Sequence, residues 1–439
     1  RARASRETQH CPCARVKIHF LVPGTGNFFC GTCLRDHTLV RELRLQGHEV
    51  TVLEMYLPHV LEEVSHDNGP LFFGGINCYL QQKFPLFRKT PRWLDKLFDH
   101  RKLIRNAMKH EGMTDAHELA AMTLSMQRGD DGFQVKELSR LVNWIHAQPE
   151  KPDVVVLSNA MLSGVAKRLK AELGCKIVCT LQGEDCFIET LGEYTDQVWD
   201  MLNHNAQYID VYHAVSASYA EKMKRCMRLS DDQVKVVYNG VHLDGFAPAD
   251  APPEIPVIGF LSRMCGPKGL ESLVDAWLEL KQDPAHGTVR LHIGGSQVNQ
   301  DVKFVAGLQA KIRAAGFGDD VRVFPNMSRA EKQDFLRGLS FLCTPPRYDE
   351  AFGLYILEAL ASGVPVVLPD RGGFPELVNA TGGGLICPAD DLVGGFRQAL
   401  ADLPGLRQKG LHGREIVQQQ FAGKNMADAF LRAGVVDPR

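Results

Sequence analysis

Short runs of apolar and β-branched residues alternate with segments of helical periodicity along most of the chain. The run "RVKIHFLVPG" predicts a buried first strand, and "TCLRDHTLVRELRLQGHEVTVLEMY" predicts a helix that ends near Gly47, followed by a second strand. "PDVVVLSN", "CKIVCTLQG" and "DVYHAVS" are further short strand-like runs. Strands that alternate with helices in this way are typical of a parallel sheet covered on both faces.

The alternation stops once and then resumes. Pro, Gly and Asp are concentrated between Asn239 and Pro256, which predicts a linker there. Beyond it, "VIGFLSRM", "VRLHIGGS", "VRVFPNM", "LSFLCTPP" and "GVPVVLPD" predict a second set of strands. We therefore expect an α/β chain of two Rossmann-like, doubly wound domains, 16–245 and 246–415, facing each other across a cleft. A disordered tail over 1–15 would precede them, and a carboxyl-terminal helix over 416–439 could return to the first domain. Ligands in such sheets bind beyond the carboxyl ends of the strands.

Composition narrows the class of protein without identifying it. The 439 residues are too many for one ordinary core, in agreement with two domains. A formal net charge of -2 provides no overall attraction to nucleic acid or anionic lipid. No apolar run approaches the ~18 residues that span a bilayer, and no secretory signal is recognisable. The 12 cysteines are scattered, which favours reduced thiols and a cytoplasmic protein.

The stretch "RYDEAFGLYILEALASGVPVV" holds two acids, Glu350 and Glu358, at a spacing that does not place them on one helical face. The pattern predicts a helix from about Phe352 to about Ser362, with Glu350 in the loop before it and Glu358 inside it. The amides of Phe352, Gly353 and Leu354 lie between the acids and, with the helix dipole, suit a phosphate. Carboxylates accept hydroxyl hydrogen bonds, so the order of groups fits the sugar, diphosphate and ribose of a nucleotide-sugar. The alternative is that both acids are solvated surface residues.

Several segments in this order resemble one known family. "EAFGLYILEALASGVPVV" resembles the E-x7-E element of the retaining glycosyltransferases of family 4, which have the GT-B fold. "GFLSRMCGPKGLESLVDAW" is similar to that family's Arg-x4-Lys-Gly segment, and "VVYNGVHLDGFAP" to its Asn-Gly-Val element. The resemblance implies sugar transfer with retained anomeric configuration and without a metal. The sequence agrees on the second point, because it has no Asp-x-Asp motif to hold a metal-bound diphosphate.

The resemblance also implies roles for particular residues. Glu350 would hold the donor sugar and Glu358 the ribose. Arg263 and Lys268 follow a predicted strand, and cations fixed there would stabilise the charge that grows on a leaving diphosphate; the alternative is an ordinary surface pair. Gly31 would meet the donor phosphates from the first domain.

Two positions depart from the family pattern. Gln182, in "CTLQGEDCF", stands where family members commonly have His. The Gln side chain cannot accept and release a proton, so we interpret Gln182 as a positioning residue. The neighbouring Asp185 or Glu184 are candidate acceptor contacts. The alternative is that Gln182 only caps a loop. Cys30 replaces a usual neighbouring Gly in "PGTGNFFCGTCLRD". That loop also fails as a dinucleotide fingerprint, because Phe29 stands where a third Gly is required.

Two further features leave alternatives open. Cys11, Cys13, Cys30 and Cys33 could hold zinc or, in part, form a redox pair, or they could simply pack or lie in a tail. The basic segment 83–110 has apolar residues at near-helical spacing. It could contact an anionic membrane or acceptor, or it could be a core-packed helix with a solvated basic face.

The sequence therefore predicts a hexosyltransferase-type enzyme that moves a sugar from a nucleotide-diphosphate sugar to a glycan, a lipid-linked carrier or a small-molecule acceptor. We expect no metal, no cofactor and no nucleic-acid partner, and a cytoplasmic location that could be peripheral at the inner face of the membrane. The alternatives are a nucleotide-sugar epimerase of the same architecture and a non-catalytic sugar-nucleotide-binding protein. A Rossmann dehydrogenase is disfavoured by the failed fingerprint.

Overall fold

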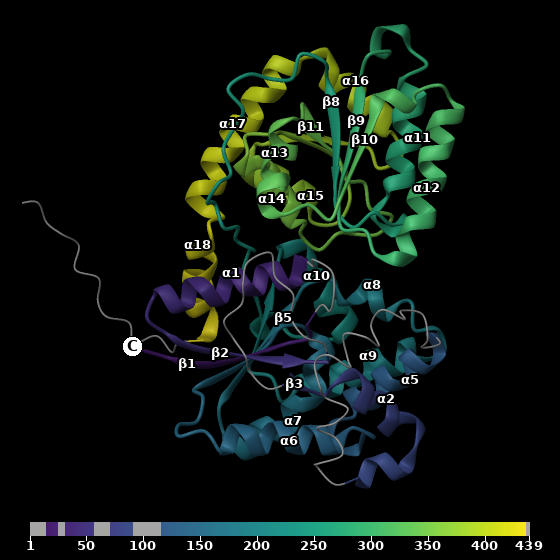
Figure 1. Ribbon diagram of the computed structural model, residues 1–439. Helices are drawn as coiled ribbons and strands as arrows, with labels where there is room; N and C mark the ends of the chain where they lie inside the picture. The colour runs from purple at the N-terminus through teal and green to yellow at the C-terminus, as the bar shows by residue number, and fades with distance from the viewer. Residues whose placement is uncertain (1–14, 25–30, 57–70, 91–115, 436–439) are drawn as a thin grey trace, which may run out of the picture.

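Two parallel β-sheets, each covered by helices, confirm the expected pair of Rossmann-like domains (Figure 1). The computed structural model describes residues 15–24, 31–56, 71–90 and 116–435. Purple-to-teal elements form the first domain and green-to-yellow elements the second, except that the last yellow helix of the chain lies with the first domain.

The first sheet has seven parallel strands in the order β3-β2-β1-β4-β5-β6-β7. The strands are β1 (Lys17–Val22), β2 (Glu49–Met55), β3 (Leu71–Phe72), β4 (Val154–Leu157), β5 (Lys176–Leu181), β6 (Val211–Ala214) and β7 (Val234–Val236). The helices of this domain are α1 (Gly31–Leu45), α2 (Gly75–Lys83), α5 (Ala116–Gln127), α6 (Val135–His146), α7 (Ala166–Leu173), α8 (Glu184–Ile188), α9 (Thr195–Ala206) and α10 (Ala217–Met227).

The interior strand β1 is buried on both faces because its side chains alternate between two helical layers. Ile18, Phe20 and Val22 pack in one cluster with Leu39 of α1. Leu21 belongs to the other cluster, which contains the apolar side of α6. The two helices lie on opposite faces of the sheet (Figure 1). A strand buried on both sides reads as a nearly continuous apolar run, which is why this strand was predictable.

The end predicted for the first helix is also confirmed. Helix α1 ends at Leu45, and Gly47 adopts a left-handed conformation with φ +90°. The amides of Gly47 and His48 donate to the carbonyls of Arg44 and Leu43 at 3.0 and 3.1 Å. These bonds satisfy carbonyls that the last helical turn leaves free, and glycine takes this conformation at little cost.

The second sheet has six parallel strands in the order β10-β9-β8-β11-β12-β13. The strands are β8 (Val257–Leu261), β9 (Arg290–Gly295), β10 (Val321–Pro325), β11 (Phe341–Leu342), β12 (Val366–Pro369) and β13 (Gly384–Cys387). The helices are α11 (Leu270–Leu280), α12 (Asn299–Ala314), α13 (Arg329–Arg337), α14 (Leu354–Ala361), α15 (Phe374–Thr381), α16 (Leu392–Ala401), α17 (Leu403–Gln420) and α18 (Gly423–Phe430).

Strand β11 and helix α14 are both shorter than their sequence patterns predict. The strand proper covers Phe341 and Leu342, and Cys343 N–H still donates to Gly259 O at 2.8 Å; Pro345 and Pro346 have no N–H to donate and so cannot extend the ladder. Helix α14 begins at Leu354, two residues later than expected, because Gly353 adopts φ +90° as the residue before the helix. Glu350 is therefore separated from the helix by an irregular segment.

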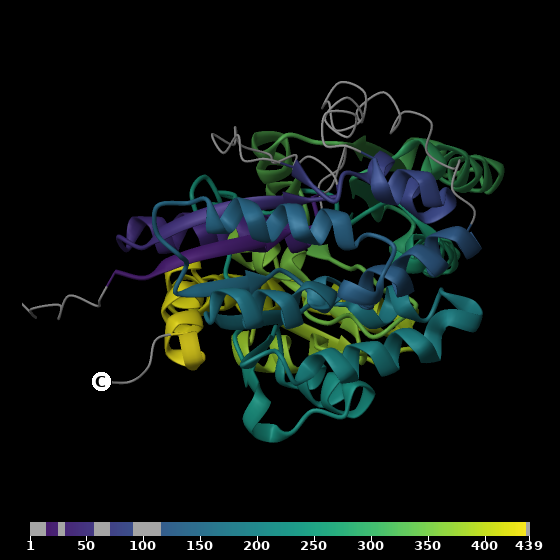
Figure 2. The ribbon, with the colours of Figure 1, turned by 90° about the horizontal axis from the view of Figure 1, so that it is seen from below.

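The chain crosses between the domains twice, at adjacent places. The linker that follows β7 pairs with the segment between α17 and α18: Val241 N–H donates to Phe421 O at 2.9 Å, and Gly423 N–H donates to Val241 O at 3.1 Å. Helix α17 lies along the second domain, and α18 lies beside α1 of the first (Figures 1 and 2). Gln46 Nε2 donates to Asp428 Oδ1 at 2.8 Å across that contact.

Each sheet has one point at which the strand order reverses. These switch points lie between β1 and β4 in the first domain and between β8 and β11 in the second. Crevices at such points are where doubly wound sheets bind ligands. The fold therefore predicts a site formed by the residues that follow these strands.

Candidate functional site

A cavity of about 350 Å³ lies between the domains and is lined by residues of both. Gly31 and Gln182 line it from the first domain. The second domain contributes the residues that follow β8 and β11, together with the start of α14. Nine of the eleven predicted site residues line this cavity: Gly31, Gln182, Arg263, Lys268, Glu350, Phe352, Gly353, Leu354 and Glu358.

Lys268 and Glu350 form an ion pair at the switch point of the second sheet. Lys268 Nζ lies 2.6 Å from Glu350 Oε2, and the two side chains are 22% and 13% exposed. Burial acts to lower the pKa of the Lys268 ammonium, but Glu350 and Tyr348 together outweigh burial and the pKa is raised. Lys268 therefore remains charged. The Tyr355 hydroxyl donates to the same carboxylate oxygen at 3.3 Å and helps to fix its position.

The amino-terminal ends of two helices face each other across the cavity. Gly31 begins α1, and a Cβ atom placed on it would lie 3.9 Å from Leu354 Cδ1, at the start of α14. The first amides of a helix have no intrahelical acceptor, and the helix dipole favours negative charge there. This part of the cavity is therefore suited to an anionic group such as a phosphate.

Glu358 is also paired with a lysine, which the sequence did not indicate. Lys332 Nζ of α13 lies 2.6 Å from Glu358 Oε1 of α14, and both side chains are nearly buried, at 8% and 12% exposed. Lys332 lines the cavity, as do Ser296 after β9 and Asn326 after β10. The two polar residues could have been found from their positions after strands. Lys332 could not, because it lies within a helix and reaches the site only through helix packing.

Arg263 is oriented by a bidentate contact. Its Nε and Nη2 lie 3.0 and 3.2 Å from the two carboxylate oxygens of Asp301, in the first turn of α12. Asp301 also accepts the amide hydrogen of Val298 at 3.2 Å. A guanidinium held by two parallel hydrogen bonds has few alternative positions. Asp301 was not predicted, because only the packing of α12 brings it beside Arg263.

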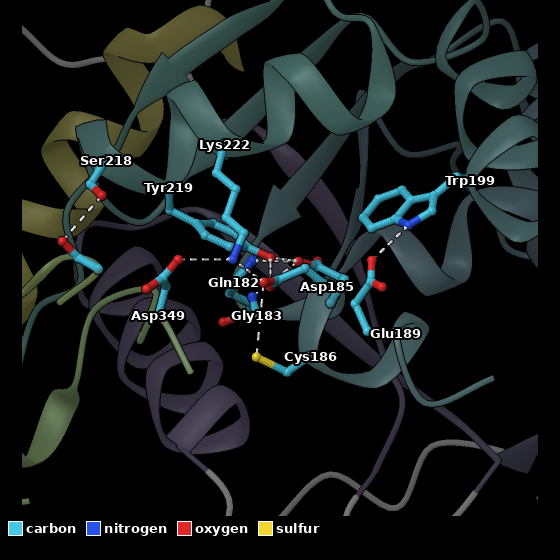
Figure 3. A network of polar contacts seen from close by, with 12 residues as sticks. Gln182, Gly183, Asp185, Cys186, Glu189, Trp199, Ser218, Tyr219, Lys222 and Asp349 are labelled. Atoms are coloured by element: carbon cyan, nitrogen blue, oxygen red, sulfur yellow. Dashed lines mark hydrogen bonds and ion pairs between the residues drawn. The ribbon is translucent and has the colours of Figure 1, made fainter. Parts of the chain in front are cut away.

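Gln182 lines the cavity with its side-chain amide already engaged. Its Nε2 donates to Ser158 O at 2.5 Å, and its backbone N–H donates to Glu184 Oε2 at 2.8 Å. These bonds leave the side-chain carbonyl oxygen as the group that Gln182 can offer to a ligand as an acceptor. Figure 3 shows this turn and the polar network around it.

Asp185 and Glu184 are placed differently from the sequence expectation. Neither lines the cavity. The Asp185 carboxylate is bound by Tyr219 Oη at 2.8 Å and by Lys222 Nζ at 2.6 Å. Glu184 accepts the amides of Gln182 and Gly183. Both carboxylates therefore face protein groups in this structure because α8 turns them inward, and their contact with an acceptor stays a prediction.

Among the described residues that line the cavity, Cys186 has a side chain with nucleophilic potential. Burial raises the pKa of its thiol to about 12, so the thiolate is essentially absent near neutral pH. Burial also raises the pKa of Tyr355 far above its usual value, which leaves that hydroxyl as a hydrogen-bond donor. The cavity thus offers fixed cations, helix amides and two paired carboxylates, a set suited to binding and charge stabilisation.

The candidate cysteine site and the basic segment 83–110 lie only partly within the described residues. Cys33 is buried on α1, whereas Cys11, Cys13 and Cys30 lie outside the described residues. Within the described ranges, no cluster of three or more metal-ligating side chains is found. Of the basic segment 83–110, only residues 83–90 are described, and they end α2 and form the short helix η1 (Pro85–Lys89).

Two family models match adjoining parts of the chain. A model described as Glycosyl transferases group 1 matches residues 246–409, and one described as Glycosyltransferase Family 4 matches residues 116–244. The chain is 33% identical over 181 residues to the lipopolysaccharide core biosynthesis mannosyltransferase LpsB of Rhizobium meliloti, covering 39% of this chain and 49% of that protein. The chain spans about half the length of the curated relatives that it matches.

Solved structures match the chain almost from end to end. Sucrose-phosphate synthase of Thermosynechococcus elongatus superposes with a TM-score of 0.68 at 18% identity, over 95% of this chain and 98% of that one. The Anabaena protein HepE, in complex with UDP and glucose, superposes with a TM-score of 0.69 at 16% identity, over 96% and 100% of the two chains. These matches show that the chain has the GT-B fold.

Proposed function

We propose that this chain is a retaining glycosyltransferase that takes a sugar from a nucleotide-diphosphate donor. The observation that supports this best is the juxtaposition of the Lys268–Glu350 pair with the start of α14, in a cavity between two switch points. The family models and the named activity of the mannosyltransferase relative favour transfer over the alternatives. Retention is carried over from the family resemblance.

In this proposal the diphosphate lies against the amides of Phe352, Gly353 and Leu354, with Gly31 approaching from the other domain. Lys268 and Arg263 stabilise the negative charge that the diphosphate gains as the glycosidic bond breaks. Such stabilisation is effective because the cations are already oriented before the reaction. The acceptor would be a glycan, a lipid-linked carrier or a small molecule, and it would attack within the same cleft.

Each carboxylate then holds a different part of the donor. Glu350 accepts hydrogen bonds from the hydroxyls of the transferred sugar, and Glu358 accepts those of the ribose. Their lysine partners hold both carboxylates in position before the donor arrives. Much of the rate enhancement would come from positioning and electrostatics.

A binding screen followed by a turnover assay tests the proposal. We expect UDP, GDP or ADP to raise the melting temperature, since a ligand at 100 times its Kd adds about 2.7 kcal/mol. The matching UDP-, GDP- or ADP-sugars are then incubated with glycan and lipid-linked acceptors. Sugar transfer supports the proposal. Conversion of donor to an isomer without any acceptor would instead identify an epimerase, and binding without turnover a non-catalytic protein.

We also expect transfer to be independent of metal ions. Side-chain cations and helix amides would neutralise the diphosphate in the role that a metal has elsewhere. The rate measured in excess EDTA should remain within about twofold of the untreated rate. Loss of activity in EDTA that magnesium or manganese restores would contradict this prediction. One equivalent of bound zinc per chain would instead support a metal site at Cys30 and Cys33.

The basic segment 83–110 is the candidate contact with an anionic acceptor or membrane. No helix among the described residues is long and apolar enough to cross a membrane. In the described part of the segment, Phe84 and Leu86 are 50% and 76% exposed, beside Arg88 and Lys89. Exposed apolar residues next to cations suit the surface of an anionic bilayer.

We expect the protein to co-sediment with vesicles containing phosphatidylglycerol and not with vesicles of phosphatidylcholine. Salt should weaken the association because attraction to surface charge is screened. A Phe84→Ser/Leu86→Ser variant should sediment at least fivefold less. Equal sedimentation with both lipids, or equal sedimentation of the wild-type and variant proteins, would contradict this prediction. It would favour the alternative that the segment is a packed helix with a solvated basic face.

A further inference from the structure

Helix α10 contacts both sides of the cavity, although it lines the cavity with none of its own residues. Within its own domain it touches the turn that carries Gln182. In the other domain it touches the segment that carries Glu350. We infer that Lys222 of α10 is a positioning residue that holds these two parts of the site in register, an inference that rests on the proposed function.

The first contact runs through the turn at Gln182. Glu184 accepts the amides of Gln182, Gly183 and Ala160 at 2.8, 3.0 and 3.0 Å, so its carboxylate fixes the backbone of the turn. The hydroxyl of Tyr219, on α10, lies 3.0 Å from Glu184 and 2.8 Å from Asp185. One buried phenol therefore joins the two carboxylates at the start of α8, and Figure 3 shows its contact with Asp185.

The second contact crosses to the other domain. Lys222 Nζ lies 2.6 Å from Asp185 Oδ2 and 3.5 Å from Asp349 Oδ2. Asp349 directly precedes Glu350. In Figure 3, the ammonium group lies between the two carboxylates, with Asp349 on one side and Asp185 on the other. A cation between two acids attracts both, so Lys222 draws the two segments toward each other.

The segment around Glu350 is held at other points as well, so a change at Lys222 alters its position rather than unfolding it. Ser216 Oγ donates to Ala351 O at 2.6 Å, and Gly373 N–H donates to Glu350 O at 2.8 Å. Glu376 of α15 accepts the amides of Ala217 and Ser218 at 2.8 and 2.9 Å, which caps α10 from the other domain. Through its contacts with Asp185 and Asp349, Lys222 adds a link between this segment and the turn that carries Gln182.

The expected result of Lys222→Met is a loss of kcat by about 10- to 100-fold, since small displacements of reacting groups have effects of this size. Affinity for the free nucleoside diphosphate should fall less than kcat, by up to about fivefold, because the shifted segment supplies only the amides of Phe352 and Gly353 while the predicted cationic contacts, Arg263 and Lys268, lie elsewhere. Lys222→Arg should regain most of the rate. Lys224→Met is the matched control: this lysine is on the same helix, but its partners Glu221 and Asp231 belong to the first domain.

A double variant tests whether the effect of Lys222 on kcat depends on its contact with Asp349. If Lys222 acts by that contact, Lys222→Met/Asp349→Asn should be no slower than Lys222→Met alone. Equal kcat values for Lys222→Met and Lys224→Met, or losses that multiply in the double variant, would overturn the inference. The assays use the full chain and whichever of UDP-glucose, GDP-mannose or ADP-glucose the wild-type protein turns over.

Hydrogen exchange separates this inference from the proposed function. Amides of residues 182–188 and 349–353 should exchange faster in Lys222→Met and at the wild-type rate in Lys224→Met. This readout needs no donor. If the wild-type protein turns over no donor, the proposed function fails while the exchange result still decides whether Lys222 holds the two segments. Unchanged exchange in Lys222→Met would overturn the inference even if transfer is observed.

Discussion

The Lys268→Met variant is expected to lose about 10²- to 10³-fold in kcat, the range found when one group that stabilises transition-state charge is removed. Lys268 is the cation at the switch point of the second sheet, and Glu350 keeps it protonated. The substitution keeps an unbranched side chain of similar length and removes the charge. Because the lost interaction strengthens as the leaving group departs, kcat should fall more than donor affinity. Steady-state kinetics with saturating donor measure the effect.

Two companion variants show whether the loss arises at the leaving group. Lys332→Met breaks the second lysine–glutamate pair of the cavity, at the ribose end of the proposed donor site, and should weaken diphosphate binding while kcat stays within about threefold. Lys268→Met/Glu350→Gln removes the carboxylate left without its partner, a buried charge that is costly to leave unpaired. If the double variant regains activity, or if Lys332→Met is equally slow, a structural effect explains the loss and Lys268 has no special role.

Glu350→Gln and Glu358→Gln should fail in different ways. Glu350 would contact the transferred sugar, where charge develops as the glycosidic bond stretches, so its loss should lower kcat by about 10²-fold or more. Glu358 would contact the ribose, remote from that bond. Its loss should weaken the free nucleoside diphosphate as much as the nucleotide-sugar, by about 1.5–3 kcal/mol for a hydrogen bond to a charged group.

Calorimetric titration of the diphosphate, beside kcat for each variant, checks both parts of this prediction. Gln has nearly the shape of Glu, so the neighbouring contacts of Tyr355 and Lys332 are disturbed little beyond the lost charge. Wild-type diphosphate affinity in Glu358→Gln, or normal turnover in Glu350→Gln, would contradict the roles assigned to this pair. Equal loss of kcat in both variants would mean that the two acids act on one part of the donor.

The sequence by itself determined the architecture and most of the residues of the candidate site. Strand β1 reads as a continuous apolar run because both of its faces are buried, and Gly47 marks the end of α1 because its left-handed conformation favours glycine. Glu350 and Arg263 were identifiable because they follow strands, where parallel sheets bring side chains to one edge. These features are local in the chain, so a local pattern can predict them.

Only the tertiary structure decided which side chains meet. Lys332 reaches Glu358 across 26 positions, and Lys222 reaches Asp349 across 127. Such pairs leave no periodic signal, because each lysine reads as an ordinary polar position on a helix. Asp185 was expected at a ligand and instead binds Tyr219 and Lys222, since the direction of α8 turns its carboxylate inward. Local patterns determine where chain segments begin and end, whereas the packing of distant helices determines which charges become partners.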